Sequence, residues 1–377
     1  MWFEPFFCFS INNTLMWLFI SVVFIQLIYY WLVFSRLAFY KKKCINPDMP
    51  SISVVIAAKN EYENLKRFLI LILDQDYPDF EVVVVNDMSE DDTSYYLRSL
   101  SEKYNNLKVV TLIENVNFFS GKKFPLSIGI KSAKNELLLL IDADCKPASN
   151  QWIKSMVSAY DSQTDIVLGY GKYEESNSFL NRLIRYDTFH IALQYMSFAL
   201  IGLTYMGVGR NLSYKKSLFY KHNGFMSHYK VRSGDDDLFI NQAAKKDNTN
   251  IQISHDSHTI SIPKNSFNDW FIQKRRHFST SGFYKAKHKL LLGLYSLSQI
   301  LFYVLAIMLS IFMHNLIIIF SLIFLRFLSQ FIIAKKTLSK LGERKILLFL
   351  PLLELIMIII NLPLAFSGIF NKENKWK

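Results

Sequence analysis

Two aspartates one residue apart stand directly after an apolar run of this 377-residue sequence, since Asp142 and Asp144 follow Leu137–Ile141. Such a pair can face one divalent cation, and a hard cation such as Mg²⁺ takes oxygen ligands while leaving positions for substrate phosphates. The pair therefore predicts a metal site for a phosphate-bearing ligand. A D-x-D tripeptide also occurs by chance, so the prediction depends on its position after the apolar run.

Polar side chains also follow two earlier apolar runs. Asn60 and Glu61 come after Ile52–Ala57, and Asp87 comes after Phe80–Val85. A single carboxylate at the end of a strand is often the N-cap of the next helix. With Asp142 and Asp144 there are three such positions, and three helix caps explain them less readily. Together they indicate one shared ligand site.

An acidic run, Asp235, Asp236 and Asp237, lies within Ser233–Leu238. Adjacent carboxylates repel one another, which raises the pKa of a carboxyl group and suits a general base. An acidic turn on the protein surface is the alternative interpretation.

Two basic segments complete the set of candidates. Gly121–Lys123 opens a predicted helix, where backbone N–H groups and a lysine favour a phosphate. A solvated basic turn is the alternative there. Gln273–His277 is a basic cluster that could bind a diphosphate through paired hydrogen bonds, or could be a polybasic patch beside a membrane.

Strand and helix patterns alternate between residues 52 and 141. The predicted strands are Ile52–Ala57, Phe80–Val85, Leu107–Ile113 and Leu137–Ile141, and the predicted helices are Glu61–Leu73, Asp91–Tyr104 and Gly121–Ala133. This alternation predicts an α/β fold with a doubly wound, mostly parallel sheet, in which ligands bind at the carboxyl ends of the strands. The candidate residues stand at those ends.

Four apolar blocks are long enough to cross a membrane as helices. The expected layout is an external N-terminus at residues 1–14, a transmembrane helix at 15–35, a globular domain at 45–285, transmembrane helices at 289–313 and 315–334, and a transmembrane or re-entrant helix at 346–370. His190–Val208 is less apolar and is expected to be a buried or membrane-surface helix.

Basic residues orient this layout. Lys41–Lys43 follow the first block and predict a cytoplasmic globular domain. A basic loop at Lys335–Lys345 agrees with that topology. The tail lysines Lys372, Lys375 and Lys377 do not agree with a fourth crossing, which is why a re-entrant helix is kept as an alternative for the last block.

One charge interrupts each of the last two apolar blocks. Arg326 and Glu354 each lie nine residues from the basic loop, or about 13 Å at a helical rise of about 1.5 Å per residue. An unpaired charge near the middle of a bilayer costs at least about 2.5 kcal/mol. The sequence therefore predicts that these two side chains pair within the membrane.

The composition limits the class of protein. Lys and Arg number 43 against 31 Asp and Glu, which gives a formal charge of +12, and 51% of the residues are hydrophobic. A disordered chain would be poorer in apolar residues, and three widely spaced cysteines exclude a disulfide framework. On a membrane protein this charge favours anionic lipid head groups as a partner, and we see no nucleic-acid-binding motif.

Taken together, these segments resemble the membrane-bound glycosyltransferases of family 2. The resemblance covers roughly residues 50–280 and the layout of the helices, and it rests on Ser51–Ile56 with Asn60 and Glu61, Val85–Asp87, Gly121–Lys122, Asp142–Asp144, Gly209–Ser213, Gly234–Asp237 and Gln273–His277. It implies a GT-A fold, a cytoplasmic active site, a nucleotide-sugar donor, and Mg²⁺ or Mn²⁺ as the metal.

The resemblance also implies a role for each candidate. Asp87 would contact the uracil or ribose of the donor, and Asp142 and Asp144 would lie at the diphosphate and its metal. Asp236 would be the base, with Asp235 beside it. The further donor-binding residues would be Asn60, Glu61, Lys122, Gln273 and Arg276, and the acceptor-side residues His277, Gly209 and Asn211. The sequence departs from the family in having Asp235 where a Glu is usual and His277 where a Trp is usual.

The implied reaction is an inverting, metal-dependent transfer of a sugar from a nucleotide-linked donor, expected to be UDP-linked, to a lipid or lipid-linked saccharide. We expect it at the cytoplasmic face of a bacterial inner membrane, in the synthesis of a cell-envelope glycan. A processive polysaccharide synthase subunit is the alternative, although an export channel usually needs more than three helices after residue 288.

Proteins of other classes explain less of the sequence. A non-catalytic nucleotide-sugar-binding membrane protein would be expected to lack Asp144 or Asp236, and both are present. A nucleotidyltransferase would not need the Gln273–His277 cluster. A transporter would be expected to show an internal repeat, and we see none. The sequence names no partner membrane protein.

Overall fold

The computed structural model describes residues 4–41, 49–113, 121–231, 233–312 and 315–370. Lys42, Lys43 and the three tail lysines lie outside these residues. The chain divides into two compact units. The globular unit comprises residues 41–284 and 340–342, and the helical unit comprises residues 1–40, 285–339 and 343–377.

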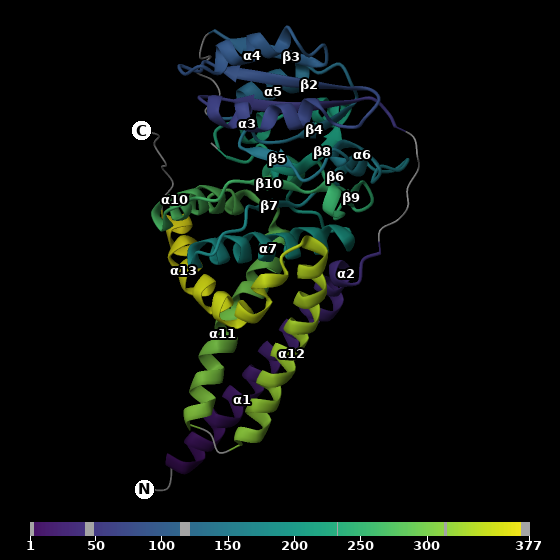
Figure 1. Ribbon diagram of the computed structural model, residues 1–377. Helices are drawn as coiled ribbons and strands as arrows, with labels where there is room; N and C mark the ends of the chain where they lie inside the picture. The colour runs from purple at the N-terminus through teal and green to yellow at the C-terminus, as the bar shows by residue number, and fades with distance from the viewer. Residues whose placement is uncertain (1–3, 42–48, 114–120, 232, 313–314, 371–377) are drawn as a thin grey trace. The chain divides into compact units, whose positions relative to one another are not determined.

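The globular unit contains a mixed sheet of seven strands in the order β3-β2-β1-β4-β8-β6-β9 (Figure 1). Its strands are β1 Ile52–Ala58, β2 Phe80–Asp87, β3 Leu107–Leu112, β4 Leu137–Leu140, β6 Ile166–Leu168, β8 Leu212–Lys215 and β9 Thr249–Ile251. The first four are parallel, and β8 runs antiparallel to both β4 and β6. The predicted α/β fold with a mostly parallel sheet is confirmed, and the four predicted strands end within two residues of their expected bounds.

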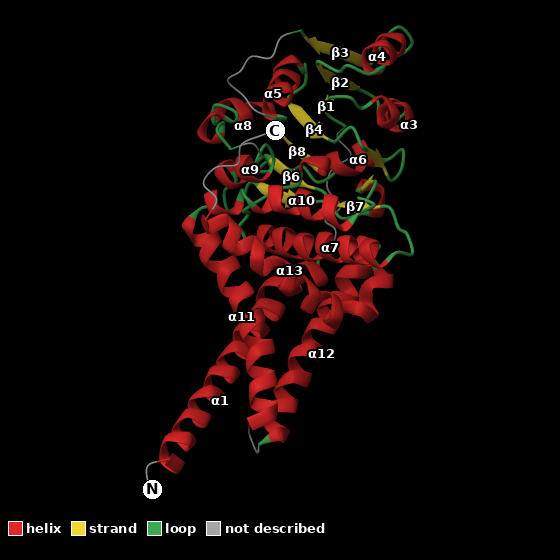
Figure 2. Cartoon of the chain, turned by 90° about the vertical axis from the view of Figure 1, so that its left-hand side faces the viewer, coloured by secondary structure: helices red, strands yellow, loops and turns green. Residues whose placement is uncertain are grey.

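Helices cover both faces of this sheet (Figure 2). Those in the first half of the unit are α3 Tyr62–Leu73, α4 Thr93–Ser101, α5 Lys123–Ser132 and α6 Trp152–Val157. Alternate residues of β1 point to opposite faces, and Ile52, Val54 and Ile56 join the core beneath α3, α4 and α6. On the other face α5 approaches closely, since a Cβ at Gly129 would lie 2.7 Å from Cγ1 of Val55.

A second, three-stranded sheet has the order β5-β10-β7, with β5 Cys145–Pro147, β7 Gly171–Tyr173 and β10 Thr259–Ser261. Asp142–Asp144 therefore lies where the chain passes from the large sheet to the small one. The later helices of this unit are α7 Phe179–Leu200, α8 Lys216–Lys221, α9 Asp237–Ala243 and α10 Phe267–Phe278. The apolar segment at His190 is the second half of α7, most of which is buried. That helix starts eleven residues earlier than expected and ends before Val208.

The helical unit contains the long apolar helices. They are α1 Glu4–Ile28, which continues through a π-helical turn at Tyr29–Phe34 into α2 Ser35–Ala38, and then α11 Ala286–Phe312, α12 Leu316–Leu341 and α13 Leu350–Phe370. Among the described residues, four stretches are long and apolar enough to cross a membrane: Asn13–Ala38, Ala286–Phe312, Leu316–Leu341 and Arg344–Leu364. They indicate an integral membrane protein with one such helix before the globular domain and three after it.

The predicted basic loop is wrong in one respect. Lys335, Lys336 and Lys340 lie within α12, which continues to Leu341, and the chain reverses only at Gly342, where φ is +74°. A glycine relieves the steric cost of that left-handed conformation. A short 3₁₀ turn, Arg344–Phe349, then leads into α13. The lysines extend the helix because nothing in their side chains stops it.

The predicted pair between Arg326 and Glu354 is confirmed. Nη2 of Arg326 lies 2.5 Å from Oε1 of Glu354, and both side chains are buried. Arg326 also donates from Nε to Gln26 at 2.7 Å and from Nη1 to Gln330 at 2.8 Å. Its guanidinium carbon lies 4.8 Å from the ring centre of Phe302, so the cation also meets an aromatic face.

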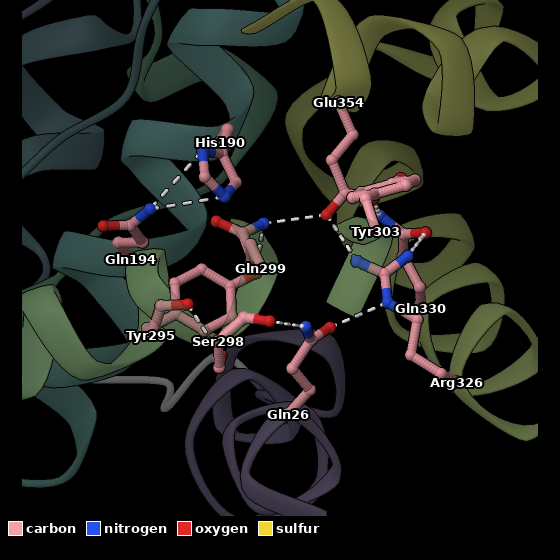
Figure 3. A network of polar contacts seen from close by, with 10 residues as sticks. All are labelled: Gln26, His190, Gln194, Tyr295, Ser298, Gln299, Tyr303, Arg326, Gln330 and Glu354. Atoms are coloured by element: carbon pink, nitrogen blue, oxygen red, sulfur yellow. Dashed lines mark hydrogen bonds and ion pairs between the residues drawn. The ribbon is translucent and has the colours of Figure 1, made fainter. Parts of the chain in front are cut away.

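Glu354 is satisfied in the same way (Figure 3). Gln299 donates to Oε1 at 2.7 Å, and Tyr303 and Gln330 donate to Oε2 at 2.8 and 3.0 Å. With Gln26 on α1, the contacts join all four long helices, and we call these six residues the four-helix polar network. Because lipid offers no partner to a polar group, such a cluster holds apolar helices together that have no hydrophobic reason to associate.

We predict that Arg326→Gln lowers the unfolding free energy of the purified protein by about 3 kcal/mol, because it leaves a buried carboxylate without its cation. The measurement is the thermal midpoint in detergent at pH 8. The double variant R326Q/E354Q removes both charges and keeps amides that can hydrogen-bond, so it should recover most of the loss. If the double variant is as unstable as the single one, the ion pair does not stabilise the bundle.

Candidate active site

Asp142 and Asp144 lie just beyond β4, where both side chains are half-buried. A carboxylate oxygen of each and Sγ of Cys145 all lie within 4.8 Å of one another. Desolvation and the nearby charge of Asp142 raise the pKa of Asp144. Cys145 is buried, and its thiol contacts Ser261 at 2.9 Å. The two aspartates thus form a concentrated negative charge whose hard oxygen atoms fit a divalent cation such as Mg²⁺ or Mn²⁺.

Lys122, the residue immediately before α5, forms an ion pair with Asp142. Although desolvation opposes ionisation of Asp142, the Lys122 ammonium holds the pKa of that carboxyl below its usual range. The charges of Asp142, Asp235 and Asp236 outweigh the desolvation of Lys122 and raise its pKa. The structure therefore places the Gly121–Lys123 segment, the acidic pair and the acidic run within one electrostatic neighbourhood.

The three aspartates of the acidic run differ in burial: one is buried within the structure, and the two open residues remain partly accessible to solvent. Asp237 is buried and accepts hydrogen bonds from the hydroxyls of Thr280 and Tyr284, the latter at 2.7 Å. Asp235 and Asp236 are only half-buried. Asp236 accepts from the backbone N–H groups of Gly209 and Asp237, each at 2.7 Å. Its carboxylate is thus oriented by the backbone and keeps further acceptor capacity.

Burial shifts the acid strength of both open residues. Desolvation, followed by the charge of Asp237, raises the pKa of Asp236 to about 6. Desolvation and the charge of Asp236 likewise raise the pKa of Asp235 to about 6, against the opposing effect of Lys122. Both groups are therefore much more basic than an ordinary aspartate, as the sequence predicted for this run.

Lys123 holds the segment that leads to the acidic run. Its buried ammonium donates to the backbone carbonyls of His228 and Val231, each at 2.6 Å. Desolvation lowers the pKa of Lys123 to about 8. This tether was not predicted, because the sequence does not show that one lysine of the Lys122–Lys123 pair points into the protein and the other toward the acids.

The loops after β1 and β2 are bound to each other. The backbone N–H of Asn60 donates to Ser89 at 2.9 Å, and the side chain of Asn60 accepts from the N–H of Glu90 at 2.8 Å. Asn60 adopts a φ of 55°, a conformation that asparagine tolerates better than most residues. Its amide oxygen is thereby committed to the loop.

Glu61 and Asp87 both have raised pKa values, chiefly through desolvation. The charges of Asp144 and Asp142 add to the shift of Glu61, which brings this residue into the same electrostatic neighbourhood. The principal charge acting on Asp87 is that of Lys59. That Asp87 shares a ligand with Asp142 and Asp144 stays a prediction.

Helix α10 carries the basic cluster and is fixed by a buried ion pair between Lys274 and Asp187 of α7, at 2.7 Å. Gln273 lies 3.5 Å from the hydroxyl of Tyr173. Arg276 and His277 are exposed to solvent. Partial desolvation and the charge of Arg276 lower the pKa of His277, which favours the neutral form of its ring.

Each of the three residues of the Gly209–Asn211 turn has a different role. The N–H of Gly209 orients Asp236, and a Cβ at this position would lie 3.3 Å from Oδ2 of that residue. Asn211 is buried and bonds to Trp152 and to the carbonyls of Tyr170 and Ser257. Between them lies Arg210, which the sequence analysis did not single out. Its side chain donates to the carbonyl of Gly171, and its charge acts on the pKa of Asp142 and Asp144.

Comparisons with known proteins agree with this geometry. Residues 53–223 match the profile of the family described as Glycosyl transferase family 2. The chain is similar to glycosyltransferase AglE of Haloferax volcanii, 31% identical over 37% of this chain and 45% of the relative. It is also similar to a beta-monoglucosyldiacylglycerol synthase of Nostoc sp., 31% identical over 31% of this chain and 25% of that protein. The chain thus matches less than half the length of either relative.

A solved structure shows the same fold over almost the whole chain. The mannosyltransferase PcManGT from Pyrobaculum calidifontis, in complex with GDP-Man and Mn²⁺, superposes with a TM-score of 0.58 at 18% identity, covering 97% of this chain and 99% of that one. The fold is GT-A, and residues 53–223 carry the sequence pattern of glycosyltransferase family 2. The resemblance seen in the sequence is confirmed.

We predict that Asp144→Asn weakens Mn²⁺ binding to the purified protein more than about tenfold, because a carboxylate ligand is lost from a site with few others. Isothermal titration with Mn²⁺ measures this directly. Asp79→Asn is the matched control, since Asp79 precedes β2 and so lies at the opposite edge of the sheet. Equal affinities of D144N and D79N would show that the acidic pair does not bind the metal.

Proposed function

We propose that this protein transfers a sugar from a nucleotide-sugar donor to a lipid or lipid-linked saccharide, with inversion at the anomeric carbon. The observation that supports it best is the acidic pair Asp142–Asp144 beyond β4, close to the Lys122 cation and facing an acidic run with raised pKa values. The family 2 sequence pattern adds the reaction class, and the four apolar helices favour an acceptor that lies in or at a membrane.

Asp144 and Asp142 are the residues that would hold Mg²⁺ or Mn²⁺. Their oxygen atoms lie close enough for one ion, and desolvation together with the charge of Asp142 raises the pKa of Asp144. A bound ion would supply Lewis-acid stabilisation of the diphosphate. The protein's own share is to keep this pair beyond the end of β4, oriented by the turn into β5.

Asp236 acts as the base in this proposal. Its carboxylate is held by two backbone N–H groups and has an acid strength suited to accepting a proton near neutral pH. It removes the proton from the acceptor hydroxyl, whose oxygen forms the new bond to the anomeric carbon as the bond to the diphosphate breaks. A single displacement inverts the configuration. Asp235 contributes to the local field, and Asp237 holds the turn.

Donor binding is assigned to residues from three parts of the globular unit: the start of α5, helix α10, and the loops after β1 and β2. Lys122 would neutralise charge on the leaving diphosphate, and Gln273 and Arg276 on α10 would close over it. Asn60, Glu61 and Asp87 would bind the nucleoside from the loops after β1 and β2. On the acceptor side, His277 offers a neutral ring. Gly209 supports the site through its backbone N–H, and Asn211 supports it through its side-chain amide.

The donor is proposed to be UDP-linked. The active site is proposed to be cytoplasmic, as the basic residues that follow the first helix favour. The boundaries proposed from the sequence, a globular domain at 45–285 between one and three membrane helices, fit a single transfer at the membrane surface. A processive synthase would need a channel for its product. The match to a beta-monoglucosyldiacylglycerol synthase over part of the chain also favours a lipid acceptor.

The test is to incubate membranes containing the protein with a panel of nucleotide sugars and to identify the products by mass spectrometry. We expect a released nucleoside diphosphate and a lipid whose mass increases by one sugar. Release of pyrophosphate would indicate a nucleotidyltransferase, and no product with any donor would contradict the proposal. A ladder of masses would favour the processive alternative.

The variant that identifies the base is Asp236→Asn. We expect it to lower the transfer rate by at least about a hundredfold, the usual size of a general-base contribution, while the affinity for the nucleoside diphosphate stays within about threefold. Asp235→Asn is the matched comparison and should retain more activity. A variant that loses nucleotide affinity without a rate defect would assign Asp236 to binding instead.

The pH dependence has a definite sign. The base must be ionised, and because the pKa of Asp236 is raised to about 6, the transfer rate should fall as the pH decreases through about 6 and approach a tenfold loss per pH unit below it. An ordinary aspartate would keep the rate constant to about pH 4. The profile of Asp235→Asn should keep this decline, and its disappearance there would make Asp235 the titrating base.

A further inference from the structure

Arg210 has an unusually fixed backbone. Its neighbours are anchored by Asp236 on one side and by the buried amide of Asn211 on the other. The carbonyl oxygen of Arg210 itself accepts a hydrogen bond from Oγ1 of Thr259 at 2.9 Å. The side chain therefore leaves the turn from a point that the small sheet and the acidic run hold in place together.

The side chain is held as firmly as the backbone. Nη2 of Arg210 donates to the carbonyl of Gly171 at 2.7 Å, and the guanidinium lies over the ring of Tyr173, 4.4 Å from its centre. A Cβ at Gly171 would lie 2.5 Å from Nε of Arg210, so only glycine leaves room for this path. Such a cation needs little reorganisation before it can bind a ligand.

Arg210 nevertheless has hydrogen-bonding capacity to spare. A guanidinium carries five N–H donors, and the buried Nε of Arg210 has no hydrogen-bond partner in the part of the chain that the structure describes. Among the described residues Arg210 forms no ion pair, whereas Lys122 is paired with Asp142. Arg210 is half-buried, and desolvating a cation that has no paired carboxylate is costly, which points to a ligand that supplies negative charge.

The location of Arg210 indicates what that ligand is. In the small sheet Ser261 of β10 lies opposite Cys145 of β5 on one side and opposite Tyr173 of β7, whose ring the guanidinium covers, on the other. Asp144 immediately precedes Cys145, so the ring beneath the guanidinium belongs to a residue two strands away from the acidic pair. Arg210 thus lies within reach of the acidic pair without neutralising it. A diphosphate that shared a metal ion with the acidic pair would lie close to the guanidinium, and the planar fork of arginine matches two phosphate oxygens at once.

We propose that Arg210 is a fixed cation that binds the diphosphate of the nucleotide and orients it on the acidic pair, in addition to Lys122. This assignment rests on the proposed function only for the identity of the ligand as a nucleoside diphosphate. The competing explanation is that Arg210 merely balances the charge of Asp142 and Asp144. The two explanations differ in the effect of Arg210 on metal binding without nucleotide.

The experiment is isothermal titration of the full-length protein in detergent with Mn²⁺ alone, and then with UDP, GDP or pyrophosphate at saturating Mn²⁺. For Arg210→Gln we expect Mn²⁺ affinity equal to or above that of the unmodified protein, and affinity for at least one diphosphate lower by about tenfold or more. Arg210→Lys should recover only part of that loss, because an ammonium cannot form the paired contact. Arg98→Gln, an exposed site on α4, controls for loss of one positive charge.

Gly171→Ala supplies a second, charge-neutral test, since it displaces the guanidinium without removing it. We expect the same loss of diphosphate affinity with unchanged Mn²⁺ affinity. Unchanged diphosphate affinity in R210Q would overturn the assignment of Arg210 while leaving the proposed function intact. If the unmodified protein binds Mn²⁺ but no diphosphate, both are wrong. Diphosphate binding that depends on Arg210, with no sugar transfer from any donor, would keep the assignment and reject the transferase reaction.

Discussion

Repulsion between half-buried carboxylates is the constraint on which the globular unit depends. Desolvation makes the ionised form of Asp142, Asp144, Asp235 and Asp236 more costly, and the charge of Asp142 raises the pKa of the other three further. Lys122 compensates only one of them by direct contact. The unliganded site therefore retains negative charge, which is the condition under which a divalent cation and the phosphates that accompany it bind favourably.

The fold supplies the precision that this arrangement requires. Parallel strands direct their carboxyl ends to one edge, and the chain leaves that edge through Asp142–Asp144 into a second sheet. The N–H of Gly209 reaches across 27 residues of sequence to fix Asp236, and Lys123 ties the preceding segment to α5. Asp236 and Lys123 are thus held by backbone groups rather than by flexible side chains, which limits the entropy lost when a ligand binds.

The sequence predicts what is local or energetically compulsory. The strands are readable because Val83 and its neighbours form a continuous apolar run, and the contact between Arg326 and Glu354 is predictable because charge in lipid must be paired. Arg210 and the tether of Lys123 were not predictable, since both depend on carbonyl groups brought near by the tertiary fold. The hydrogen bond from Arg326 to Gln26 was not predicted for a related reason. Gln26 has no charge and no spacing that distinguishes it from other polar residues of α1.

Two clusters of charge in one chain show the same principle with opposite outcomes. In the four-helix polar network both oxygens of Glu354 and three nitrogens of Arg326 have partners from the protein, so the two opposite charges compensate each other directly. At the acidic pair the charges are not fully compensated. Among the described residues Arg210 forms no ion pair with Asp142 or Asp144, and the pKa of Asp144 stays raised. A fully satisfied buried cluster stabilises a structure, whereas one left incomplete stores the free energy that a ligand of complementary charge can release. The incompleteness of the second cluster is therefore the physical reason to place substrate binding there and assembly of the helices at the first.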